Sequence, residues 1–127
     1  MMSTELFRRI LWAAAAFNVF GACLLGFPAS SAGQLAGLPA DVPLAYRALV
    51  TVFVLLFGGT YAWLAWQPQP NRPMVVLGTI GKVSVVVVVV ALWLAAEASL
   101  NSVAVVAGDL VFALAFAYWL RGSKPAA

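Results

Sequence analysis

The chain has 127 residues, of which 65% are hydrophobic and only 9% are charged. A soluble domain of this size needs more charged surface, so the composition excludes an ordinary soluble protein. The net charge is +3, but the basic residues are scattered at the ends of apolar segments and form no patch that could track phosphates, so we expect no nucleic-acid partner.

Four apolar segments are each long enough to cross the hydrocarbon core of a bilayer, which takes about 20 residues. They cover residues 6–27, 46–66, 73–96 and 103–120. The connections between them are short, so the sequence predicts a single membrane domain over residues 1–127. We expect an all-α, integral membrane, four-transmembrane-helix antiparallel bundle in which neighbours in sequence are also neighbours in space.

The first segment has two interpretations. Arg8 and Arg9 precede an apolar run that ends in "PASSAGQ", which would suit a cleaved signal peptide. The run is longer than the roughly 7–15 residues of a signal-peptide core, so we expect it to be retained as a membrane helix. The connection that follows, "PASSAGQLAGLPADVP", is the longest, and "SSAGQLAG" within it predicts one turn of interfacial helix.

The basic residues are unevenly divided between the two ends of the predicted bundle. With four spans, both termini and the turn "QPQPNRP" lie on one side. That side carries Arg8, Arg9, Arg72, Arg121 and Lys124, and the other side carries only Arg47. Because positive residues accumulate on the cytoplasmic side, we expect a multi-pass protein of the inner (plasma) membrane with both termini cytoplasmic and membrane lipids as its surroundings.

The third segment contains "GTIGKVSVVVVVV", in which Lys82 stands shortly before six consecutive valines. At about 1.5 Å of rise per residue, Lys82 lies roughly 15 Å from the boundary marked by Arg72. By the same measure Asp109, in the fourth segment, lies roughly 18 Å from that boundary and Asn18, in the first, roughly 13 Å. Three helices therefore bring a polar residue to one depth.

A charge at the centre of a membrane helix costs about 2.5–3.5 kcal/mol on insertion scales. Pairing Lys82 with Asp109, with Asn18 supplying further hydrogen bonds, would offset much of that cost. Three interpretations stay open for Lys82. Its side chain could snorkel toward the headgroups, or it could form a structural ion pair that fixes the helix register. The third interpretation is that Lys82 belongs to a working site for a proton, ion or ligand.

The second segment adds a stripe of residues at spacings of three and four, which share one helix face. They are Arg47, Thr51, Val54, Gly58, Tyr61 and Ala65. We predict a ligand or ion-pair cluster made of Asn18, Lys82, Asp109, Tyr61, Thr60 and Arg47. For Arg47 an interfacial anchor or a pair with Asp41 is the simpler interpretation. Small residues at this level allow close helix approach or leave room for a ligand.

The sequence has no histidine and a single cysteine, Cys23. This excludes an internal disulfide and argues against haem, an iron–sulfur cluster or a structural zinc site, so we expect no metal and no cofactor.

Several short motifs resemble a known group of proteins. An arginine-led first segment is followed by "YRALV" in the second, "GTIGK" in the third and "AGDLVFALAFAYWL" in the fourth. Over most of the chain this pattern is similar to small bacterial four-helix membrane proteins of the DoxX-like kind. The resemblance implies a membrane subunit associated with redox or thiol metabolism, although the chain has no redox residues of its own.

Three functions follow as hypotheses. The leading one is a non-enzymatic membrane protein whose polar cluster supports packing and offers a site for a small ligand or a membrane-protein partner. The first alternative is an oligomeric transporter or channel for protons, ions or a small solute, since a bundle of four helices is thin for a pore. The second is an enzyme that modifies a lipid or quinone, which is disfavoured because no nucleophile lies beside a base.

Overall fold

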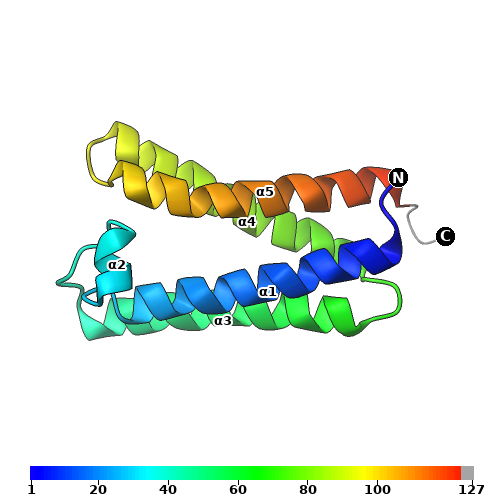
Figure 1. The fold of residues 1–127 in the computed structure, drawn as a ribbon, viewed down its shortest axis with the longest axis horizontal. Helices are drawn as coiled ribbons and strands as arrows, with labels where there is room; N and C mark the ends of the chain where they lie inside the picture. The colour runs from blue at the N-terminus through cyan, green and yellow to red at the C-terminus, as the bar shows by residue number, and fades with distance from the viewer. Residues whose placement is uncertain (124–127) are drawn as a thin grey trace.

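The computed structural model describes residues 1–123, so Lys124 lies outside the described residues. Four long helices and one short helix follow each other along the chain (Figure 1). They are α1 (Thr4–Gly26), α2 (Ser31–Leu35), α3 (Leu44–Trp66), α4 (Arg72–Leu94) and α5 (Leu100–Gly122). Residues 1–123 contain no strand, and the expected short helix of the first long connection is α2.

Each long helix has 23 residues and is apolar enough to cross a membrane. At about 1.5 Å per residue such a helix reaches about 34 Å, slightly more than the roughly 30 Å hydrocarbon core. The large side chains on the outer faces are mostly apolar and exposed, as Leu56, Val87 and Leu114 are. The all-α four-helix membrane bundle predicted from the sequence is confirmed, and the chain is a multi-pass membrane protein.

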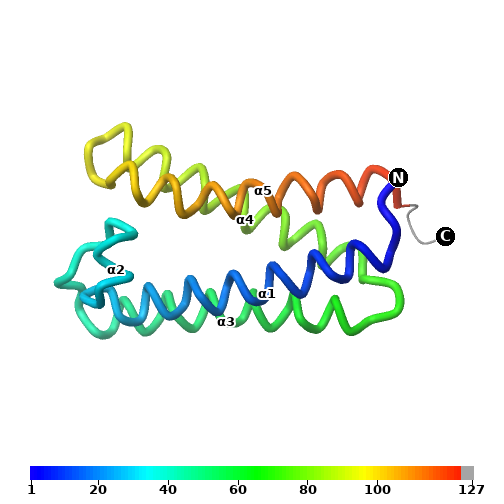
Figure 2. Tube along the Cα trace, viewed as in Figure 1, coloured from blue at the N-terminus to red at the C-terminus, as the bar shows by residue number. Residues whose placement is uncertain are grey.

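The long helices pair into two antiparallel hairpins. Helix α1 packs along most of α3, and α4 packs along most of α5, whereas contacts between the two pairs are few. Figures 1 and 2 show that the hairpins lie close together at the end that carries the N-terminus and separate toward α2. The expectation that all sequence neighbours pack together therefore needs a correction, because α3 and α4 touch only locally.

We call the end with the N-terminus and residues 67–71 the termini end, and the opposite one the α2 end. The buried core of large side chains lies toward the termini end. Its members include Phe7, Leu11, Leu64, Val75, Phe116 and Trp119. The Phe7 and Trp119 rings stack with centroids 4.3 Å apart, so α1 and α5 are joined across the hairpins here.

Arginines at the starts of three helices cap the ends of the helices packed beside them. The last carbonyls of a helix have no hydrogen-bond donor within the helix and carry partial negative charge. A guanidinium donates a hydrogen bond to such a carbonyl and also brings a compensating positive charge. The bonds run from Arg8 to Ala65 O at 2.7 Å, from Arg47 to Gly26 O at 2.9 Å and from Arg72 to Leu120 O at 3.3 Å. Each hairpin is thereby tied by a charged hydrogen bond at one or both of its ends.

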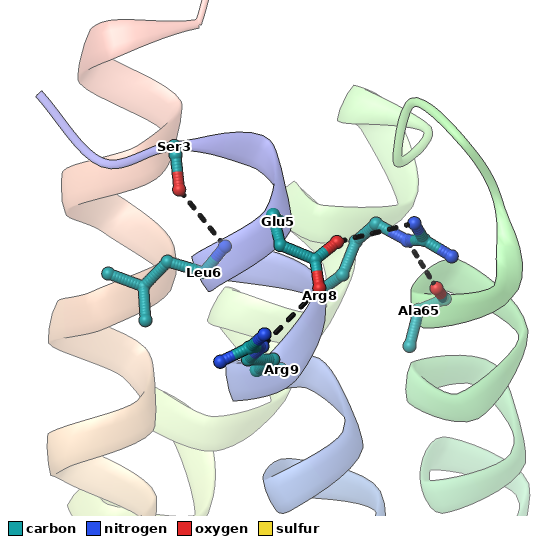
Figure 3. Close-up of polar contacts among 6 residues, drawn as sticks. All are labelled: Ser3, Glu5, Leu6, Arg8, Arg9 and Ala65. Carbon is teal, nitrogen blue, oxygen red and sulfur yellow. Dashed lines mark hydrogen bonds and ion pairs between the residues drawn. The ribbon is translucent and has the colours of Figure 1, made fainter.

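Figure 3 shows the first turn of α1, where the bond from Arg8 to Ala65 joins α1 to α3. The Ser3 hydroxyl accepts a hydrogen bond from the Leu6 amide and caps the helix. Glu5 lies within 3.6 Å of Arg8 and 3.3 Å of Arg9, which places the acidic group in the first turn where the helix dipole favours it.

The end of α4 adopts a left-handed turn at an alanine. Ala96 has φ of 60°, and the amides of Ala96 and Glu97 donate back to the carbonyls of Trp93 and Leu92. This pair of bonds is a Schellman motif, which favours glycine at the left-handed position because a Cβ is crowded there. The motif turns the chain toward α5 within five residues.

Candidate functional site

The three polar residues predicted at one depth meet between the hairpins. The Lys82 ammonium donates to Asp109 Oδ1 at 2.7 Å and to Asn18 Oδ1 at 3.1 Å. Asn18 Nδ2 in turn donates to the Val54 carbonyl at 3.1 Å. The network links all four long helices, because Asn18 comes from α1, Val54 from α3, Lys82 from α4 and Asp109 from α5.

Aromatic rings enclose the Lys82 ammonium on its remaining sides. Nζ lies 5.1 Å from the ring centroid of Tyr61, 5.2 Å from that of Phe112 and 5.4 Å from that of Phe17. Ring faces attract a cation at such distances. Lys82 is only 3% exposed, so its side chain points inward and does not snorkel toward a headgroup region.

Of the two rings that the sequence analysis missed, Phe17 precedes Asn18 in the chain, and Phe112 lies three residues after Asp109 on the same helix face. Those spacings were the available signal. They are weak, because aromatic residues occur on every face of these helices.

Tyr61 and Thr60 have different roles in the structure. Tyr61 is buried, and its hydroxyl donates to the Gly78 carbonyl at 3.4 Å. The Thr60 hydroxyl donates to the Leu56 carbonyl of its own helix at 2.9 Å and takes no part in the cluster. Successive helical residues are turned by about 100° from each other, so the two side chains face different ways.

Arg47 lies apart from the cluster. Its guanidinium caps α1 at Gly26, and Val54, which contacts Asn18, lies seven residues further along α3, or about 10 Å. Within residues 1–123, Arg47 forms no ion pair with Asp41. Of the two simpler interpretations of Arg47, the pair with Asp41 is therefore not formed, because the carbonyl at the end of α1 accepts a hydrogen bond from the guanidinium instead.

Glycines let rings of one hairpin rest against the backbone of the other. A methyl group built on Gly78 would lie 2.8 Å from Tyr61 Cε1, and one on Gly108 would lie 2.6 Å from Phe17 Cζ. Such distances are too short for real contacts, so neither position has room for a side chain. The small residues at this level therefore accommodate aromatic rings of the opposite hairpin.

A cavity of about 790 Å³ fills the space between the hairpins on the α2 side of the cluster. Lys82, Asp109 and Asn18 form its floor. Its walls are largely apolar and come from all four long helices, with Leu24, Phe53, Val85 and Val106 among them. The cavity is only partly enclosed, so it communicates with the space around the bundle.

The segment after α2 crosses the α2 end of this cavity. The Ser102 hydroxyl donates to the Ala36 carbonyl at 3.1 Å, and Asn101 Nδ2 donates to the Leu35 carbonyl at 3.0 Å. Gly37 has φ of 78°, and a Cβ there would collide with the Ser99 hydroxyl. The cavity is thus bounded by the polar floor at one end and by residues 36–39 at the other, which leaves the sides between the hairpins as the route to the membrane.

Within residues 1–123 no group of three or more histidine, cysteine, aspartate or glutamate side chains could hold a metal ion. No family model matches the chain, and searches of curated proteins and of solved structures found no match. The DoxX-like resemblance stays a prediction.

Proposed function

We propose that this protein is a non-enzymatic membrane protein that binds a small lipid-soluble molecule in the cavity between its hairpins. The observation that carries the proposal is that an apolar cavity ends on a charged, hydrogen-bonded floor. Ligand sites commonly have volumes of about 300–1,000 Å³, with apolar walls and a few convergent polar groups. The cavity here has about 790 Å³ and this composition.

A purely structural ion pair would not call for such a cavity. Protein interiors are close-packed, and a void of this size beside a buried charge forfeits the contacts of every side chain that lines it. In a membrane the space is filled by an apolar molecule, either an acyl chain or a dedicated ligand. The polar floor favours the dedicated ligand, because an acyl chain has no group that could donate a hydrogen bond to the Asp109 carboxylate.

We propose the inner (plasma) membrane as the location, with both termini cytoplasmic. Arg8, Arg9, Arg72 and Arg121 at the termini end support this orientation, against Arg47 alone at the α2 end. The cavity then lies in the outer half of the bilayer and opens sideways into the outer leaflet. A ligand that partitions into lipid reaches it without crossing water.

Two glycines provide a matched test. Gly21 lines the cavity, and a Cβ there would meet only Val54 Cγ1 at 4.0 Å, so Gly21→Leu fills the cavity without a backbone clash. Gly59 has nothing within 4 Å of a built Cβ and lies outside the cavity lining, so Gly59→Leu is the control.

The test screens lipid-soluble alcohols, phenols, quinones, fatty acids and amines for thermal stabilisation of the detergent-solubilised protein. We expect at least one class to raise the melting temperature of the wild type and of Gly59→Leu, but not that of Gly21→Leu. Equal responses of all three proteins would refute a ligand site in this cavity.

One observation favours transport as the second candidate. The cavity reaches from the α2 end to the Lys82–Asp109 pair, while the packed core fills the other half of the bundle. A pathway that leads from one side of the membrane to a mid-membrane ionisable site has this shape, and residues 36–39 would have to move aside to open it. A four-helix bundle would need a homo-oligomer or another membrane protein to complete the path. Liposomes should then show a pH- or voltage-dependent flux that Asp109→Asn abolishes, and no flux across a broad panel of ions and solutes would reject transport.

A further inference from the structure

We infer that the ligand is a neutral, lipid-soluble molecule that ends in a hydroxyl group, an alcohol or a phenol, which donates a hydrogen bond to Asp109. This inference rests on the proposed function and specifies the chemistry of the same cavity. The hydrogen bonds that the floor residues already make limit what a ligand can offer them.

The ammonium in the floor has no donor left for a ligand. A lysine ammonium has three N–H groups. Two of those of Lys82 go to Asp109 and Asn18, and the rings of Phe17, Tyr61 and Phe112 surround the ammonium. With Lys82 only 3% exposed, a carboxylate, phosphate or carbonyl in the cavity finds no free N–H group on the ammonium. Asn18 Nδ2 has a second N–H besides the one donated to Val54, and a ligand hydroxyl can accept from it while it donates to Asp109.

One acceptor of the floor stays accessible. Asp109 uses Oδ1 for Lys82, and its Oδ2 accepts no hydrogen bond from residues 1–123. The Asp109 side chain is 16% exposed and lines the cavity. Because an ionised carboxylate only accepts hydrogen bonds, a ligand that binds to Asp109 Oδ2 must donate one.

The charge balance selects a hydroxyl over an ammonium. Lys82 and Asp109 already neutralise each other at 2.7 Å, so a cationic ligand would add an uncompensated charge at mid-membrane depth. A hydroxyl donates to a carboxylate without adding charge, and such charge-assisted bonds are short and strong. The apolar walls then require an alkyl, isoprenoid or ring body of a size that fits about 790 Å³.

The experiment compares three probes that share one body and differ in the polar end. They are para-octylphenol, which donates a hydrogen bond, and para-octylanisole and para-octylacetophenone, which only accept. Radiolabelled probes are equilibrated with the full chain in nanodiscs, with empty nanodiscs as the background. We expect the phenol to bind at least about tenfold more tightly than either acceptor, the factor that a hydrogen bond to a charged group commonly contributes.

Asp109→Asn reverses the requirement. The amide oxygen replaces Oδ1 as the acceptor for Lys82, which turns the amide N–H₂ toward the cavity in place of Oδ2. The ketone should then bind more tightly than the phenol. Gly21→Leu should bind none of the probes, and Gly59→Leu should bind them as the wild type does.

The possible outcomes distinguish a failure of the hydroxyl inference from a failure of the proposed function. Equal binding of all three probes to the wild type, lost in Gly21→Leu, would overturn the hydroxyl inference and keep the cavity as a ligand site. Tighter binding of the ketone to the wild type would overturn it as well. Binding of no probe above the nanodisc background would overturn both the inference and the proposed function. The comparison within the wild type decides the matter even where Asp109→Asn fails to fold.

Discussion

Removing either partner of the Lys82–Asp109 pair should destabilise the bundle far more than removing both. Lys82→Met leaves the Asp109 carboxylate without a partner and takes the donor from Asn18 Oδ1. Breaking one side of a buried pair commonly costs about 3–5 kcal/mol. Asp109 is partly exposed to the cavity, so we expect the lower end, about 3 kcal/mol.

Asp109→Leu should cost less, about 2 kcal/mol, because Lys82 keeps Asn18 and three ring faces, each cation–π contact contributing about 0.5–2 kcal/mol. In the double variant no unpaired charge remains. A methionine at position 82 suits an aromatic surrounding, so the double variant should lose only about 1 kcal/mol. The coupling between the two sites should therefore be about 4 kcal/mol.

The assay is reversible unfolding of the four proteins in mixed micelles, followed by far-UV circular dichroism. Ser84→Ala is the control, because Ser84 is exposed on the same helix and bonds only to the Ile80 carbonyl. It should change the free energy of unfolding by less than about 0.5 kcal/mol. If the two single losses simply add in the double variant, the pair contributes nothing to stability and the reasoning fails.

Three further substitutions test other parts of the fold by thermal melting in detergent. Ala96→Gly relieves a left-handed alanine and should stabilise the protein by about 1 kcal/mol, and a lower melting temperature would contradict the φ of 60°. Gly78→Ala should reduce stability by about 1–3 kcal/mol, because the added methyl group would contact the Tyr61 ring. Gly59→Ala is its control and should be neutral or stabilising. Equal effects of the two substitutions would refute the contact between Tyr61 and Gly78. Arg47→Met should cost about 1.5–3 kcal/mol through the lost bond to Gly26, and an unchanged melting temperature would show that this cap contributes nothing.

The sequence was sufficient for the parts of the structure that follow from local composition and from the cost of charge in lipid. Segment length and hydropathy located the ends of the four spans to within about three residues, the usual uncertainty of boundaries predicted from sequence. Lys82, Asp109 and Asn18 could be placed together because three polar residues at one depth have few other ways to avoid lipid.

The separation of the hairpins and the cavity between them could not be predicted in this way. They depend on which rings rest on which glycines, as Phe17 does at Gly108, and many aromatic and small residues in the chain would have been equally plausible partners. The assignment of Thr60 to the cluster is a different case. Its neighbour Tyr61 already faced inward, and helix geometry alone could have excluded Thr60.

The most direct test of the ligand-binding account is native mass spectrometry of the protein extracted from its own membrane in mild detergent, in three forms. The account predicts a single apolar molecule of defined mass bound one-to-one to the wild type and to Gly59→Leu, and absent from Gly21→Leu. Fragmentation of that molecule should reveal a free hydroxyl group. A wild type that carries only the bulk lipids of the membrane, in the same proportions as Gly21→Leu, would contradict the account.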